Sequence, residues 1–193
     1  MKINVIGTGY VGLVSGVCMA AKGHSVKCFD TNPETIQILK SGKCHFYEKG
    51  LEKLFVEYGY NLSFELLDET SEHKLLDCQV ILIAVGTPTV NKKIDLTQIK
   101  TVTKTIGKII KNSDKFISVI VKSTVVPGTT DTVVKNILEE SSGKKIGEFG
   151  LGMNPEFLRE GNAVEDFMNP DRIVFGYEDK ITLEYLHEIY SPW

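Results

Sequence analysis

Three glycines near the N-terminus are spaced as a binding turn for a phosphorylated ligand requires. They belong to the segment GTGYVG, residues 7–12, which directly follows the apolar run 3–6. Gly7 permits a sharp turn out of a strand, Gly9 leaves the backbone open to a diphosphate, and Gly12 permits close packing of the helix that follows. The first amides of that helix present a partial positive charge to phosphate groups. The segment therefore predicts a dinucleotide-binding turn.

An acidic residue follows this turn at the end of the next apolar segment. Asp30 ends the segment 25–29, where a carboxylate can accept both hydroxyls of an adenosine ribose. The carboxylate would repel the 2′-phosphate of NADP, and no arginine lies within the next few residues to receive one. We therefore expect NAD as the cofactor. A flavin or a methyl-donor nucleotide on a similar fold would also tolerate this acid, so other segments must decide between them.

Predicted strands and helices alternate along the rest of the chain. Asn32 is expected to cap a helix that begins at Pro33, and Thr129 a helix that runs through Leu138. Further strands are predicted at 62–66, 80–85, 116–121, 149–153 and 173–175, and further helices from 51, from 95 and over 182–190. This alternation predicts an α/β fold, a doubly wound and mostly parallel sheet of the Rossmann type with helices on both faces.

Unusual polar motifs stand where these predicted strands end. Besides GTGYVG and Asp30 they are GTPT at 86–89, KST at 122–124 and NPEFLREG at 154–161. Ligands of open α/β sheets bind at the carboxyl ends of the strands. We therefore expect all of these motifs to contribute to one site.

Composition excludes several classes of function. The net charge of −3 gives no electrostatic basis for binding nucleic acid or an anionic membrane. No apolar run reaches the length of a membrane span, and no signal peptide is recognisable, so we expect a cytoplasmic protein. Unpaired spacing predicts reduced thiols at Cys18, Cys28, Cys44 and Cys78. We expect no metal site, because Cys44 and His45 are too close for a usual zinc pair.

Taken in order, the motifs GTGYVGLVSGVCMAAKGH, GTPT, KSTVVPGTT and NPEFLREGNAVEDFMNPDRIV resemble the nucleotide-sugar dehydrogenases. The resemblance runs from Met1 to about Ile173 and is strongest to those acting on UDP-glucose, while those acting on GDP-mannose or UDP-N-acetylmannosamine share most of the motifs. Such enzymes oxidise the primary alcohol of a sugar to a carboxylate with two NAD in succession, through a covalent thioester. The resemblance implies a UDP-sugar substrate and a homodimer for the complete enzyme.

The resemblance also implies roles for matched positions. Contacts to NAD are implied for Gly7, Gly9, Tyr10, Val11, Gly12, Asp30, Thr87, Thr124 and Glu160. Substrate contacts, largely through backbone, are implied for Glu156, Phe157, Leu158, Arg159 and Glu160. Glu156 and Thr124 are implied as catalytic residues that position or activate water for thioester hydrolysis. The residues alone leave simpler roles open: Thr124 as a turn cap, and Glu156 as an acceptor for backbone N–H groups of its own loop.

The sequence also departs from the family pattern. Lys49 stands where members commonly have proline in YEPGLE, and Thr35 stands where a basic residue often helps to bind adenosine. None of the four cysteines has the Cys-Phe-Pro-Lys context of the family nucleophile. We therefore expect residues 1–193 to be the NAD-binding domain alone, with the central helix and C-terminal substrate domain absent, and to be inactive by itself. Two alternatives to a nucleotide-sugar dehydrogenase domain are a non-catalytic NAD-binding module and a hydroxy-acid dehydrogenase. The NPEFLREG motif argues against both alternatives, and the KST motif argues against the hydroxy-acid dehydrogenase.

Overall fold

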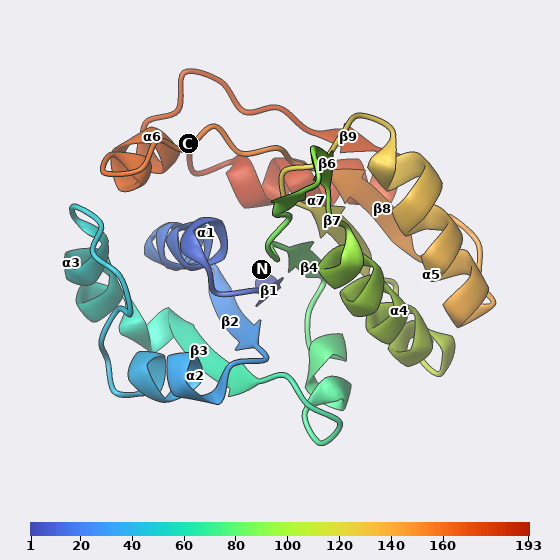
Figure 1. Cartoon of the computed structure of the whole chain (residues 1–193), viewed down its shortest axis with the longest axis horizontal. Helices are drawn as coiled ribbons and strands as arrows, with labels where there is room; N and C mark the ends of the chain where they lie inside the picture. Colours follow the sequence, from blue (N-terminus) through green and yellow to red (C-terminus); the bar gives the residue numbers. More distant parts are fainter.

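The computed structural model describes all 193 residues, which form one layered α/β unit around a seven-stranded sheet (Figure 1). The sheet has the order β3-β2-β1-β4-β7-β8-β9 and is parallel except for the last pair. Its strands are β1 (Lys2–Ile6), β2 (Ser25–Asp30), β3 (Leu62–Leu66), β4 (Val80–Ile83), β7 (Ser118–Val121), β8 (Gly150–Met153) and β9 (Gly176–Tyr177). Apart from the edge strand β9, this is the doubly wound order expected.

Helices cover both faces of the sheet, and each face of the sheet has its own apolar core (Figure 1). One core lies under α1 (Tyr10–Ala21), α2 (Pro33–Lys40), α3 (Leu51–Glu57), α6 (Ala163–Met168) and α7 (Lys180–Tyr190). The other lies under α4 (Thr97–Lys111), α5 (Lys135–Ser142) and the π-helical turn Thr130–Val134 that leads into α5. Short 3-10 turns occupy Gly59–Asn61 and Glu72–Leu76. The predicted fold class is therefore confirmed.

Local sequence signals explain where two of these helices begin. The side chain of Asn32 accepts hydrogen bonds from the backbone N–H groups of Glu34 (2.9 Å) and Thr35 (3.2 Å), which confirms it as the cap of α2. Asp95 accepts bonds from the N–H and hydroxyl of Thr97 at the start of α4. The apolar residues Ile99, Val102, Ile106 and Ile110 of α4 are all buried, as their helical spacing predicts.

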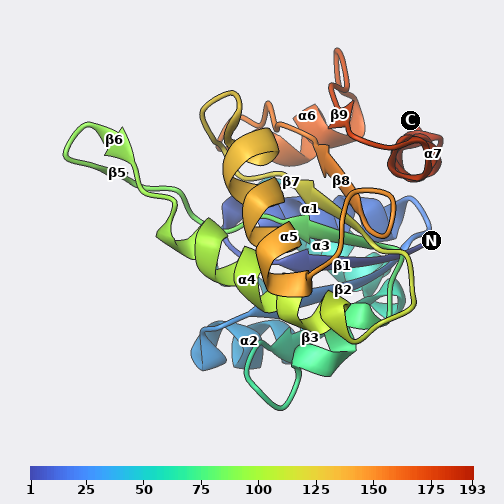
Figure 2. The same ribbon diagram turned by 90° about the vertical axis from the view of Figure 1, so that its right-hand side faces the viewer.

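Two local predictions were wrong, and one element was not predicted. Thr129 does not cap a helix, because its hydroxyl donates to the carbonyl of Val126 in the preceding turn. The last strand lies at 176–177 rather than 173–175, and it pairs antiparallel to β8. A hairpin of β5 (Thr89–Val90) and β6 (Lys93–Ile94) was not expected; it projects away from the body of the molecule (Figure 2).

Strand register brings the polar motifs to one edge. Ile6 at the end of β1 is paired with Phe29 of β2 and with Ile83 of β4. Ile83 is paired with Val121 of β7, which is in turn paired with the last residue of β8. Because the parallel strands end level with one another, the segments that follow them emerge side by side. The expectation that one edge of the sheet collects the motifs is therefore confirmed.

The structure also bears on membranes and metals. None of the helices has both the length and the apolar character that crossing a membrane would require. His, Cys, Asp and Glu side chains nowhere gather in threes in a way that could hold a metal ion.

Candidate functional site

The glycine turn has the geometry expected of a diphosphate-binding loop. Gly7 adopts a φ of +96°, and its N–H donates to the carbonyl of Phe29 at 2.8 Å. A Cβ on Gly7 would lie 2.6 Å from the carbonyl oxygen of Ala84, and one on Gly12 would lie 1.8 Å from the carbonyl oxygen of Gly7. A Cβ on Gly9 would meet no atom within 4 Å. Gly7 and Gly12 thus serve packing, whereas the space above Gly9 is open to a ligand.

The start of α1 fits the diphosphate of a dinucleotide. Gly9 precedes the helix and supplies no side-chain cap, so the first N–H groups of α1 are left for another acceptor. Val11, in this first turn, is half-buried. Together with the open space above Gly9, these donors are what NAD would require here.

The Asp30 carboxylate is held by the same loop. Its Oδ2 accepts hydrogen bonds from the N–H (2.8 Å) and the hydroxyl (2.7 Å) of Thr8, and its Oδ1 accepts from the N–H of Asn32 at 2.9 Å. Three donors leave one of its four lone-pair directions free. Thr8 therefore orients the residue expected to bind the ribose. Thr8 was not assigned a role from the sequence, although its place between two glycines of the motif was a signal.

The side-chain hydroxyl of Tyr10 is engaged by the loop before α3. It donates to the carboxylate of Glu48, which lies in that loop and is buried. Burial, followed by the bond to Glu48, raises the pKa of Tyr10 to about 12. Only backbone atoms of Tyr10 can therefore serve the expected contact. Glu48 was not assigned a role from the sequence, although it stands in the YEKGLE segment that the family resemblance includes.

A hydrogen bond joins the GTPT and KST motifs. The hydroxyl of Thr87 donates to the backbone carbonyl of Thr124 at 2.7 Å, and the Thr124 side chain is exposed. The two threonines are thus brought together as predicted. Their assignment to the nicotinamide side of the cofactor stays a prediction.

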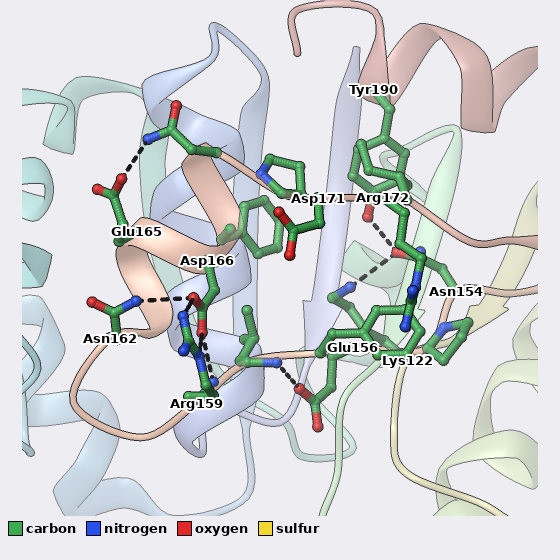
Figure 3. A pocket seen from close by; sticks show the side chains of 17 residues that line it. Lys122, Asn154, Glu156, Arg159, Asn162, Glu165, Asp166, Asp171, Arg172 and Tyr190 are labelled. Atoms are coloured by element: carbon green, nitrogen blue, oxygen red, sulfur yellow. Dashed lines mark hydrogen bonds and ion pairs between the residues drawn. The ribbon is translucent and has the colours of Figure 1, made fainter.

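The NPEFLREG segment forms the wall of a cavity of about 330 Å³ (Figure 3). Glu156 lines it, and its Oε2 accepts the N–H of Leu158 at 2.6 Å, which is the simpler role left open by the sequence. Arg159 forms a bidentate pair with Asp166, at 2.6 and 3.1 Å, and this pair lowers the pKa of Asp166. The second oxygen of Glu156 stays available for a proton or a water.

Exposure to solvent differs along the predicted substrate segment. Phe157 is 52% exposed, and the guanidinium of Arg172 stacks on its ring at 5.2 Å. Glu160 is also exposed. The structure therefore brings Glu156, Phe157, Leu158 and Arg159 to the cavity, with Phe157 and Arg159 also exposed to solvent, and leaves Glu160 outside its lining.

Lys122 lies at the inner wall of the same cavity. Its ammonium donates to Oδ1 of Asn154 at 2.9 Å and lies 5.4 Å from the ring centre of Phe167 (Figure 3). The residue is 3% exposed, and burial lowers its pKa to about 8, against an opposing effect of Glu156. The hydroxyl of Tyr190 also donates to Asn154. Lys122 was not assigned a role from the sequence, although it is the first residue of the KST motif.

We expect Lys122→Met to stabilise the domain in a pH-dependent way. Burial disfavours the charged lysine, so the folded protein pays a penalty of about 3 kcal/mol below pH 8. The penalty is relieved as the pH rises from about 8 toward the ordinary lysine value of 10.5, because the folded state loses its proton first. Asn154 keeps Tyr190 as a donor in the variant. Urea unfolding at pH 7.5 and pH 10 measures the difference.

The exposed Lys104 of α4 provides the control, since Lys104→Met removes a charge without changing a buried group. The advantage of Lys122→Met over wild type should shrink toward pH 10, while Lys104→Met follows wild type throughout. A difference in the free energy of unfolding between Lys122→Met and wild type that is constant with pH would show that burial does not disfavour the charged form of Lys122.

The C-terminal residue packs behind this cavity. The indole N–H of Trp193 donates to the carbonyl of Phe167 at 2.8 Å, and its ring lies 5.6 Å from that of Phe167 and 5.4 Å from that of Tyr190. The ammonium of Lys22 lies 4.9 Å from the centre of the indole ring. The end of α7 is thereby attached to α6 and α1.

Comparisons with known proteins agree with these features. Residues 1–193 match the model of the UDP-glucose/GDP-mannose dehydrogenase family, NAD binding domain. The chain is 42% identical over 194 residues to a GDP-mannose 6-dehydrogenase of Pseudomonas aeruginosa, covering 98% of this chain and 44% of that protein. It is 38% identical over 194 residues to a UDP-glucose 6-dehydrogenase of Haloferax volcanii, covering 100% of this chain and 44% of that protein.

Solved structures show the same likeness. A ternary complex of GDP-mannose dehydrogenase from P. aeruginosa has a TM-score of 0.93 and 41% identity, covering 99% of this chain and 44% of that one. A UDP-glucose dehydrogenase from Pyrobaculum islandicum has a TM-score of 0.90 and 38% identity, covering 98% of this chain and 44% of that one. The chain thus spans less than half the length of these relatives.

Proposed function

The chain belongs to the UDP-glucose/GDP-mannose dehydrogenase family as its NAD-binding domain, and on that premise we propose that it forms the cofactor half of a nucleotide-sugar 6-dehydrogenase. The observation that carries the proposal is the convergence of the glycine turn, GTPT, KST and NPEFLREG at one edge of the sheet. A domain that only sensed NAD would need no cavity-lining NPEFLREG segment beside the cofactor loop.

The reaction we propose converts the primary alcohol of the sugar to a carboxylate. The carbon loses two hydrides to two NAD in succession and gains the oxygen of one water. In this chain, the first turn of α1 would hold the diphosphate and Asp30 the adenosine ribose, and Thr87 and Thr124 would line the reacting end. The water would be held by Thr124 and activated by the free oxygen of Glu156.

UDP-glucose is the substrate we propose, as the motifs indicate. GDP-mannose is the second candidate, because a relative named for that substrate is 42% identical to this chain. Both candidates share the sugar primary alcohol that the chemistry requires, so they differ in the nucleotide and sugar contacts rather than in the reaction.

The test is an assay of the complete gene product with each of three nucleotide sugars and NAD. We expect formation of two NADH for each UDP-glucose consumed, with GDP-mannose and UDP-N-acetylmannosamine turned over at least about a hundredfold less efficiently. Preference for GDP-mannose would replace the substrate and keep the reaction. Failure to oxidise any nucleotide sugar would overturn the proposed function.

We expect the domain to bind NAD at least about a hundredfold more tightly than NADP. Asp30 is fixed by Thr8 and Asn32 where a 2′-phosphate would bring a second negative charge. Asp30→Asn should reduce the preference by about tenfold or more, measured by calorimetry with both cofactors. Glu34→Gln, in the exposed first turn of α2, removes a nearby charge and should leave the ratio unchanged. Equal affinities in wild type would remove Asp30 from the ribose site.

A further inference from the structure

The carboxylate of Glu48 joins segments that are far apart in the sequence. Its Oε2 accepts the hydroxyl of Tyr10 and the N–H of Gly161, the latter at 2.9 Å. Its Oε1 accepts the N–H of Ala163 at 3.0 Å. The N–H of Gly161 also lies 3.1 Å from the Tyr10 hydroxyl oxygen. One carboxylate thus holds the start of α1 to the end of the NPEFLREG segment.

Burial makes these bonds obligatory. Glu48 is 3% exposed, and a buried carboxylate is tolerated only when it is hydrogen-bonded or paired. Its partners are two backbone N–H groups and one hydroxyl, so Glu48 is acceptor to all of them. Neither backbone donor can turn away without moving its segment. Loss of one bond would leave a buried polar group unsatisfied. This energetic cost opposes independent motion of the Glu48 loop, the start of α1 and the end of the NPEFLREG segment.

The parts that Glu48 connects belong to different binding functions. Tyr10 is the first residue of α1, whose N-terminal amides we propose to hold the diphosphate, and its ring centre lies 5.3 Å from that of Phe46 in the Glu48 loop. Gly161 directly follows NPEFLRE with a φ of +84°, and Ala163 begins α6. A shift at the start of α1 can therefore reach the NPEFLREG segment through two side chains, Tyr10 and Glu48.

We propose that Glu48 is a positioning residue that couples NAD at the α1 N-terminus to the ordering of the NPEFLREG segment. The proposal rests on the proposed function only in treating that segment as the one that contacts the sugar nucleotide. Coupling of this kind is reciprocal, so a ligand that orders NPEFLREG would tighten NAD binding by the same factor. The order in which cofactor and sugar nucleotide bind would then affect both affinities.

Hydrogen exchange at the amides of Gly161 and Ala163, followed by NMR with and without saturating NAD, tests the coupling. In wild type we expect NAD to slow exchange at both amides by about tenfold. In Tyr10→Phe the two backbone bonds to Glu48 are retained but the link to α1 is removed, so NAD should slow exchange by less than about twofold. In Glu48→Gln the amide group would meet the N–H donors, so exchange should be faster from the start and insensitive to NAD.

Tyr47→Phe is the matched control, because Tyr47 neighbours Glu48 in sequence and is 88% exposed. It should respond to NAD as wild type does, and calorimetry on the same samples establishes that each variant is saturated. A purely structural Glu48 would let Tyr10→Phe retain the full response to NAD, which would overturn the proposal. So would a wild type that binds NAD without slower exchange; both results leave the dehydrogenase assay unaffected.

Discussion

Replacing Gly9 with valine is expected to abolish measurable NAD binding while the domain stays folded. Gly9 has an ordinary φ of −63°, and a Cβ there would meet no protein atom within 4 Å, so the free protein leaves room for a side chain at this position. In the proposed complex with NAD the same space would be needed by the diphosphate and by its approach to the first amides of α1. Losing two charge-assisted bonds of about 1.5–3 kcal/mol each would lower the affinity by roughly a hundredfold to ten-thousandfold.

Calorimetry measures the affinity, and circular dichroism with urea unfolding establishes the folded state. Gly9→Ala serves as a graded control, since its single methyl group should weaken binding less than the branched valine. Unchanged affinity in folded Gly9→Val would mean that the dinucleotide does not use this loop. A valine variant that failed to fold would contradict the open space that the structure shows.

Gly12→Ala is expected to lower mainly the free energy of unfolding, whereas Gly9→Val lowers mainly the affinity for NAD. Its Cβ would lie 1.8 Å from the carbonyl oxygen of Gly7 and 3.2 Å from the Cβ of Ala84, so the loop and helix must separate. Overpacking typically costs about 1–3 kcal/mol, and a clash with backbone at this distance places the cost at or above the upper end. The gain in helix propensity, about 1 kcal/mol, does not offset it. Urea unfolding measures the loss.

Gly59→Ala controls for the change of glycine to alanine itself, because a Cβ there meets nothing within 4 Å. Its free energy of unfolding should stay within about 1 kcal/mol of wild type. A Gly12→Ala variant as stable as Gly59→Ala would show that the contact between α1 and the loop is looser than described.

The sequence predicts the fold and the location of the site because both depend on local signals. Alternating apolar runs and amphipathic helices determine a parallel sheet, and parallel strands place whatever follows them at one edge. Roles could be predicted individually for the glycines of the turn and for Asp30, because each of these positions has a backbone or charge requirement that few residues meet. The cap at Asn32 is equally local, and the structure confirms it.

What the sequence did not predict depends on contacts between distant segments. In the sequence, nothing distinguishes Glu48 from other acidic residues in loops, and only the fold places it beside Tyr10 and Gly161. In the sequence, Lys122 is a lysine at the end of a strand, and only the fold shows that Asn154 and Phe167 enclose its ammonium group. The edge strand β9 is only two residues long, which is too short to show the alternation of apolar and polar residues that predicts a strand. Its pairing with β8 could therefore not be predicted. Thr129 is a local exception, because its hydroxyl donates to the carbonyl of Val126, three residues earlier, instead of capping the helix.

The packing of Trp193 gives this domain an intrinsic optical probe. Trp193 is the only tryptophan of the chain, and its indole is anchored to Phe167, whose ring lines the cavity. Its emission therefore arises from a single environment, which a ligand in the cavity would alter through Phe167 and Tyr190. Indole emission also overlaps the absorption band of reduced nicotinamide but not that of the oxidised form. Quenching by energy transfer would thus distinguish bound NADH from bound NAD without any added label.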